Sequence, residues 1–271
     1  MSVSRLKTFV IAALLLLCAM FLTLLISNAI AHNRERARIQ DALVNTYQRS
    51  GVTVECALPV DDGAAVFVTV RDPFRESRLA VAAIGNCEQT ESAAGGISRF
   101  ENDTGSIEFD TLGGFTVEYS QGADGKTPLS AARALLRSMK IDTGELSSVS
   151  EGGFTTVTAH VRFKKSEIVN ARVTFEFADG LLRRVTGRNV TRAEKSAADT
   201  KFYDLQTLMV SLLGSISRGD IRCTSITAVN GAYLMGVTAF GDGTLVPGWR
   251  VVTDAGEWFL NAETGQCEVV V

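Results

Sequence analysis

The chain has 271 residues, of which 46% are hydrophobic and 21% are charged, and its formal net charge is −3. This length is sufficient for one large domain or for two to three small ones. The mildly acidic balance and the lack of a basic run exclude nucleic acid as the expected partner.

An uninterrupted apolar stretch, Thr8 to Ile26, lies near the start of the chain and contains no charged residue, proline or glycine. A helix of this length spans about 28 Å, close to the hydrocarbon thickness of a bilayer. We therefore expect residues 1–31 to form a cytoplasmic tail and a single-pass anchor in the cell membrane, with an extracytoplasmic body. Ala29-Ile30-Ala31 has the form of a signal-peptidase site, so a cleaved signal peptide is the alternative; the length of the stretch favours an uncleaved anchor.

Small residues recur along one side of this helix, at Ala12, Ala19, Thr23 and Ser27. Their spacing of seven, four and four residues brings them into one stripe. Membrane helices associate through close packing at small residues and through hydroxyl hydrogen bonds. The stripe therefore predicts a packing face for a partner helix. A chance run of small residues is the alternative, because no G-x-x-x-G motif is present.

Residues 32–120 are predicted to form a first α+β domain. A helix is expected to end at Gly51, because glycine suits the left-handed position after a helix. Asp72 and Pro73 place a capping carboxylate before a first-turn proline, which predicts a second helix up to Ile84. Short strands follow, and the polar, glycine-containing segment QGADGKT marks the end of the domain.

Two further units, 128–190 and 196–271, each show one helix followed by four strands. Asp179-Gly180 and Asn230-Gly231 both predict tight hairpins inside these units. The repeated pattern indicates an internal duplication, with one helix laid across an antiparallel sheet in each unit. The expected fold class is therefore α+β: one transmembrane helix followed by helix-plus-antiparallel-sheet units.

Four cysteines lie outside the apolar stretch, at Cys56, Cys87, Cys223 and Cys267. An even number permits two disulfides, and sequence proximity favours Cys56 with Cys87 and Cys223 with Cys267. The alternative is four buried or unpaired thiols, since cysteine is among the most buried residue types. No C-x-x-C motif supports a zinc or redox site.

No catalytic signature is visible. The sequence contains no H-E-x-x-H, G-x-S-x-G, Walker or G-x-G-x-x-G motif. His160 falls on the polar side of a strand, and we interpret it as a solvated side chain rather than a base. Two D-T-G triplets, at Asp103 and Asp142, are too close together for the two lobes of an aspartic protease, and we interpret the first as a turn. We therefore expect no enzyme, no cofactor and no metal site.

The C-terminal stretch contains Pro247-Gly248-Trp249 and then Gly256-Glu257-Trp258-Phe259. These two segments resemble the closing hairpin of YycI-type proteins and of related PepSY-like modules. A P-x-W strand is followed by a G-E-W-F strand and a T-G turn. The order of elements along the chain, with a short S-R-x-K start and an early apolar helix, also resembles YycI. The residues of this family-like hairpin are Pro247, Trp249, Gly256, Trp258, Phe259, Thr264 and Gly265.

This resemblance implies a membrane-anchored accessory protein of a Yyc (Wal) two-component system. Such proteins restrain the sensor histidine kinase that controls cell-wall metabolism, together with the companion protein YycH. No catalytic residues come with the family, in agreement with the lack of catalytic motifs. A PepSY-like inhibitor or chaperone of an extracellular peptidase is the alternative function.

Overall fold

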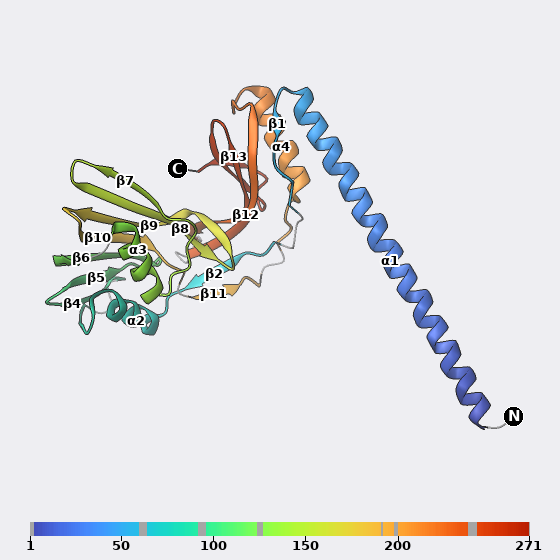
Figure 1. Cartoon of the computed structure of the whole chain (residues 1–271), viewed down its shortest axis with the longest axis horizontal. Coiled ribbons are helices and arrows are strands. Elements are labelled where there is room, and N and C mark those ends of the chain that lie inside the picture. Colours follow the sequence, from blue (N-terminus) through green and yellow to red (C-terminus); the bar gives the residue numbers. More distant parts are fainter. Residues whose placement is uncertain are drawn as a thin grey trace. The chain divides into compact units, whose positions relative to one another are not determined.

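The computed structural model describes residues 3–59, 64–91, 96–123, 127–190, 192–197, 200–237 and 243–270. The chain divides into two compact units, an N-terminal unit (Met1–Thr53) and a second unit (Val54–Val271) that we call the body. Figure 1 labels the helices and strands of both units.

The N-terminal unit consists of one helix, α1 (Val3–Arg49), before the two-residue strand β1 (Thr53–Val54) at the unit boundary. The predicted stop at Gly51 is confirmed. Gly51 has φ +82°, and the N–H of Val52 donates to the carbonyl oxygen of Tyr47 at 3.0 Å. A positive φ turns the chain back on the last helical carbonyls, which would otherwise lack partners.

The expected transmembrane helix requires correction. Within the described residues, no helix is long and apolar enough to cross a membrane. The apolar stretch is also not an element of its own. It forms the first part of a 47-residue helix that continues through Arg34, Glu35 and Arg38 to Arg49.

The body is built mainly from strands. In chain order, its elements are β2 (Phe67–Val70), α2 (Pro73–Ile84), β3 (Glu88–Glu91), β4 (Ser98–Asn102), β5 (Gly105–Phe109), β6 (Gly114–Ala123), α3 (Pro128–Ser138), β7 (Ser147–Glu151), β8 (Phe154–Phe163), β9 (Ser166–Ala178), β10 (Leu181–Arg188), β11 (Arg192–Lys195), α4 (Leu205–Arg218), β12 (Ser225–Val237), β13 (Gly243–Thr253), β14 (Gly256–Asn261) and β15 (Cys267–Val269).

The first part of the body is an antiparallel sheet with the strand order β3-β4-β5-β6-β10-β9-β8-β7. Two consecutive repeats of the chain build this sheet, and each repeat is a helix followed by four strands. The first repeat runs from α2 to β6 and the second from α3 to β10. The last strands of the two repeats, β6 and β10, pair at the centre. Helices α2 and α3 contact each other and cover the same face (Figure 1).

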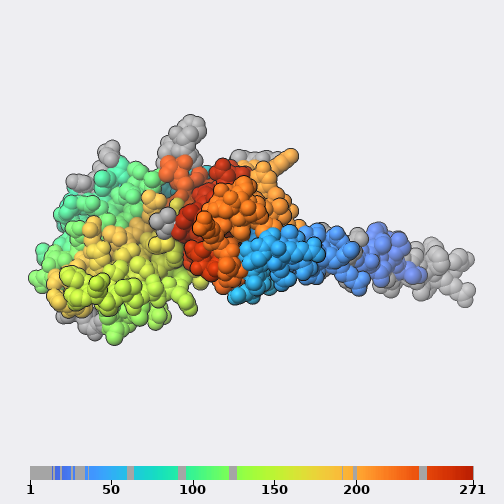
Figure 2. Space-filling model, turned by 90° about the horizontal axis from the view of Figure 1, so that it is seen from above, coloured from blue at the N-terminus to red at the C-terminus, as the bar shows by residue number. Residues whose placement is uncertain are grey.

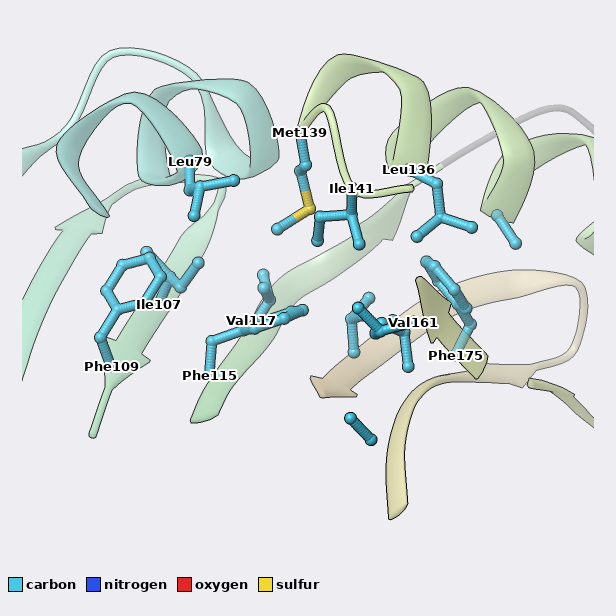
Figure 3. Close-up of a cluster of buried hydrophobic side chains, with 14 of the residues drawn as sticks. Leu79, Ile107, Phe109, Phe115, Val117, Leu136, Met139, Ile141, Val161 and Phe175 are labelled. Carbon is cyan, nitrogen blue, oxygen red and sulfur yellow. The ribbon is translucent and has the colours of Figure 1, made fainter. Parts of the chain in front are cut away.

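One hydrophobic core lies between these two helices and the sheet (Figure 3). Alternate residues of each strand face it, so that Phe115 and Val117 are buried while Thr116 between them is not. The core therefore spans both repeats. Its labelled side chains are Leu79, Ile107, Phe109, Phe115, Val117, Leu136, Met139, Ile141, Val161 and Phe175.

Local signals placed several elements correctly. Helix α2 has the predicted bounds, because the Asp72 carboxylate accepts the N–H of Arg75 and Gly85 ends the helix with φ +90°. Asp179 and Gly180 turn between β9 and β10 with positive φ at both residues, as a type I′ hairpin requires. Helix α4 begins at Leu205, because the Asp204 carboxylate accepts the N–H of Thr207 and caps the helix.

The second part of the body contains β12 to β15, an antiparallel sheet on which α4 packs against β14. The predicted hairpin at Asn230-Gly231 is wrong. Both residues lie inside β12, which pairs with β13 continuously from Ala228 to Val237. Neither residue has a positive φ, so this Asn-Gly pair does not turn the chain.

The expectation of separate antiparallel units also requires correction, because the body is one large mixed sheet. Strand β12 pairs in parallel with β9 at Glu167 and Ile168, and β2 pairs with both β13 and β11. The cause is an open edge. Strand β10 covers β9 only from Val173 to Ala178, and an uncovered edge leaves backbone N–H and C=O groups without partners. Strand β12 pairs along this uncovered edge.

Candidate functional site

The family-like hairpin forms part of the structural core. Pro247 and Trp249 lie on β13, and Trp258 and Phe259 lie on β14. Trp249 and Phe259 are buried, so their rings belong to the sheet core. Figure 2 shows the side chains of these red strands beside those of α4 and β12 in orange. The aromatic residues therefore stabilise the sheet.

The glycines and the threonine of the hairpin make turns. Gly256 connects β13 to β14 with φ +135°. After β14, Asn261 organises the next turn, because its Oδ1 accepts the N–H groups of Glu263 and Thr264 at 2.9 and 3.1 Å. Gly265 follows with φ +73°. Asn261 was not among the predicted site residues, although an Asn side chain that accepts N–H groups two and three residues further on is a known turn signal.

A charged cluster joins the two parts of the body. The guanidinium of Arg250 donates to both carboxylate oxygens of Glu257, at 2.8 and 2.6 Å, and to Glu167 at 2.7 Å. The hydrogen bond from Arg250 lowers the pKa of Glu257, and the carboxylate in turn raises the pKa of Arg250. Because Glu167 lies on β9, Arg250 connects β9 with β13 and β14. The charged groups of Arg250, Glu167 and Glu257 are paired with one another, which indicates a structural role.

His160 lies at the margin of this cluster, opposite Arg172 on β9. Its strand neighbours Ala159 and Val161 are buried while His160 is only half-buried, so its predicted polar side is confirmed. Burial lowers the pKa of His160, and the positive charge of Arg172 lowers it further. Among the described residues, no group of three or more His, Cys, Asp or Glu side chains could hold a metal ion.

The two expected disulfides do not form in this structure. All five cysteines, including Cys56, Cys87, Cys223 and Cys267, are free thiols. Burial raises the pKa of Cys56, Cys87 and Cys223, and it raises the pKa of Cys267 to about 11. Because the thiolate is the reactive form of cysteine, a raised pKa disfavours nucleophilic reactivity.

The small-residue stripe of α1 stays a prediction. The side chains of Ala12 and Ala19 lie outside the described residues. Thr23 and Ser27 are exposed, and the hydroxyl of Thr23 donates to the carbonyl oxygen of Met20 in its own helix at 2.8 Å.

The hairpin of β7 and β8 presents the features of a protein-binding edge. Strand β7 pairs with β8 alone, so its outer N–H and C=O groups have no partner strand within the described part of the chain. Val149 of β7 and Phe154 of β8 are 70% and 66% exposed. Val149 pairs with Thr156, two residues after Phe154, so both apolar side chains lie on the sheet face without helices. The sequence pattern predicted these strands but not which one forms the edge.

Comparisons with known proteins give distant structural likenesses. No family model matches the chain, and no curated protein matches it. An uncharacterized protein from Eubacterium rectale aligns with a TM-score of 0.47 and 8% identity, covering 81% of this chain and 90% of that chain. The C-terminal domain of YpeB from Bacillus megaterium aligns with a TM-score of 0.39 and 9% identity, covering 75% of this chain and 99% of that chain.

Because both TM-scores lie below 0.5, neither likeness assigns a family or a function to this chain.

Proposed function

We propose that this protein is a non-enzymatic regulator that binds the sensor histidine kinase of a cell-wall-controlling two-component system of the Yyc (Wal) type. A YycH-like companion protein is the second proposed partner. The choice of partner rests on the resemblance of the closing hairpin and of the order of elements. A PepSY-like inhibitor or chaperone of an extracellular peptidase is the alternative.

The observation that carries a binding role is the open edge of the β7–β8 hairpin. An unpaired edge strand can accept an extended segment of another protein as an additional strand. Main-chain hydrogen bonds then provide affinity, and side chains on alternate positions provide specificity. Here Val149 and Phe154 offer exposed apolar surface beside that edge. We infer that the partner contributes an extended, apolar segment that pairs with β7.

Copurification with the tagged full chain from detergent-treated cells tests this proposal. A captured histidine kinase supports the leading function, a captured peptidase supports the alternative, and capture of neither contradicts both. Val149→Lys should abolish capture, because it places a charge in the apolar contact. Val210→Lys on α4 is the matched control, since Val210 is also exposed, at 59%. If Val149→Lys captures the partner as well as Val210→Lys does, the β7 edge is not the binding surface.

Both candidate functions require the body from Leu58 onward to lie outside the cytoplasm. Protease added to intact protoplasts should then digest the body. Full protection, with digestion restored after lysis, would contradict both functions.

A further inference from the structure

Four arginines line one pocket of the body, at the start of α2. The pocket has a volume of about 710 Å³ and is lined by Arg71, Asp72, Pro73, Phe74, Arg75, Arg78 and Arg192. Arg71 precedes α2, Arg75 and Arg78 belong to α2, and Arg192 comes from β11. Residues about 120 positions apart in sequence thus build one basic site. The concentration of positive charge is unusual in a chain whose net charge is −3.

The arginines have different roles in this pocket. Arg71 is fixed in place: it donates to both oxygens of Glu76 at 2.7 and 3.0 Å, to Ser98 at 2.7 Å and to the carbonyl oxygen of Gly96 at 2.9 Å. Glu76 is buried, and this bidentate pair neutralises its charge. Arg71 therefore supports the pocket and keeps Glu76 from opposing an anion.

Arg78 and Arg192 remain available to a ligand. Arg78 is exposed, and among the described residues Arg192 pairs only with Glu194, at 2.6 Å, in a contact where both side chains are more than half exposed. Exposed ion pairs contribute little free energy, so Arg192 can exchange this partner for a stronger anion. The one acidic residue of the lining, Asp72, already accepts the N–H of Arg75 as the cap of α2.

We propose that this pocket binds a phosphate ester. Guanidinium groups form bidentate hydrogen bonds with phosphate oxygens, and several of them can share one phosphate group. The volume exceeds what a phosphate group alone requires and lies in the range of small-molecule sites. Phe74 is 84% exposed at the pocket and offers an apolar surface to the remainder of the ligand. A soluble phosphate monoester and a phospholipid headgroup share this chemistry.

Two binding measurements on the full chain distinguish these sources. Isothermal titration calorimetry uses glycerol 3-phosphate as the soluble probe. Cosedimentation compares vesicles of phosphatidylglycerol and phosphatidylcholine with vesicles of phosphatidylcholine alone. Arg78→Gln/Arg192→Gln should weaken phosphate binding by about tenfold or more, because charge-assisted hydrogen bonds are lost. Arg133→Gln is the control, since Arg133 is an exposed arginine on α3 outside the pocket.

If glycerol 3-phosphate binds to the native chain and to Arg133→Gln but not to the double variant, the site is assigned to a soluble ester. If the native chain and Arg133→Gln sediment with vesicles that contain phosphatidylglycerol but the double variant does not, the site is assigned to a lipid headgroup. The proposal is overturned if neither probe binds, or if Arg133→Gln weakens binding as much as the double variant does. The test needs no protein partner, so its outcome is independent of the proposed regulatory function.

Discussion

At the scale of single residues, Gly248 lies on β13 opposite Asn261 of β14, where no side chain fits. A Cβ atom at this position would overlap the backbone carbonyl oxygen of Leu260 and the ring of Phe259. Gly248→Ala should therefore lower the free energy of unfolding by about 1–3 kcal/mol, as overpacking does in cores. Chemical denaturation measures this change.

Gly231→Ala on the neighbouring strand β12 is the control for Gly248→Ala. A Cβ at Gly231 would meet only the Trp249 ring, at an ordinary contact distance of 3.7 Å. Its effect should be much smaller. Equal losses in the two variants would contradict a steric role that is specific to Gly248.

His160 gives the body a pH dependence whose sign follows from its lowered pKa. Burial, followed by the positive charges of Arg172 and Arg250, lowers the pKa of His160 from its ordinary value of 6.5, although the carboxylates of Glu167 and Glu257 oppose this shift. As pH falls through about 6.5, the unfolded chain binds a proton that the folded chain rejects, so stability decreases. Glu257 does not interfere, because its pKa is lowered from 4.5 and it stays ionised in this range.

Replacing His160 with Gln should flatten the dependence of stability on pH between about 7.5 and 5.5. Urea denaturation at several pH values measures the slope for both proteins. An unchanged slope in His160→Gln would show that His160 does not carry this pH dependence.

At the scale of elements, one side chain completes the junction between β9 and β12. Asn170 of β9 donates to the carbonyl oxygen of Met235 at 2.7 Å and accepts the N–H of Met235 at 2.9 Å. Its amide thus acts as an additional peptide group beyond the two parallel backbone pairs at Ala232 and Tyr233. The junction is short, so this side chain forms a substantial part of it.

Asn170→Ala should cost about 2 kcal/mol, because it leaves two backbone groups of Met235 without partners. Thr174→Ala, on the same face of β9, is the control. Hydrogen exchange should also accelerate at Met235 in Asn170→Ala while it stays unchanged in β6. A loss of stability below about 0.5 kcal/mol would indicate that water replaces the Asn170 amide.

At the scale of the whole molecule, the mixed sheet makes the two parts of the body one structure. The parallel pairing of β12 with β9 and the Glu167–Arg250 ion pair both connect these two parts. We therefore expect the body to unfold in one cooperative transition. Both tryptophans, Trp249 and Trp258, lie on β13 and β14, so their fluorescence reports on the unfolding of the second part of the body.

Hydrogen exchange in α2 and α3 reports on the opposite end of the body. The two probes should give the same urea midpoint on the full chain. If the fluorescence midpoint lies at a lower urea concentration than the hydrogen-exchange midpoint, β12 to β15 unfold independently of the first sheet.

The sequence by itself determined the elements whose signals are local. Asp72, Pro73 and Gly85 set both ends of α2, and Asp179-Gly180 set the β9–β10 hairpin, because capping and turn chemistry involve residues only a few positions apart. The polar side of His160 followed from the two-residue period of a strand. These features required no knowledge of distant parts of the chain.

Only the tertiary structure decided what depends on distant partners. Asn230-Gly231 has the sequence of a turn, yet it lies inside β12, because β13 pairs along the whole strand. Asn170 and Met235 are 65 residues apart, and Arg192 meets α2 only after β11 pairs with β2. Such contacts follow from which strand edge stays uncovered, and a periodic pattern of apolar residues carries no information about that edge.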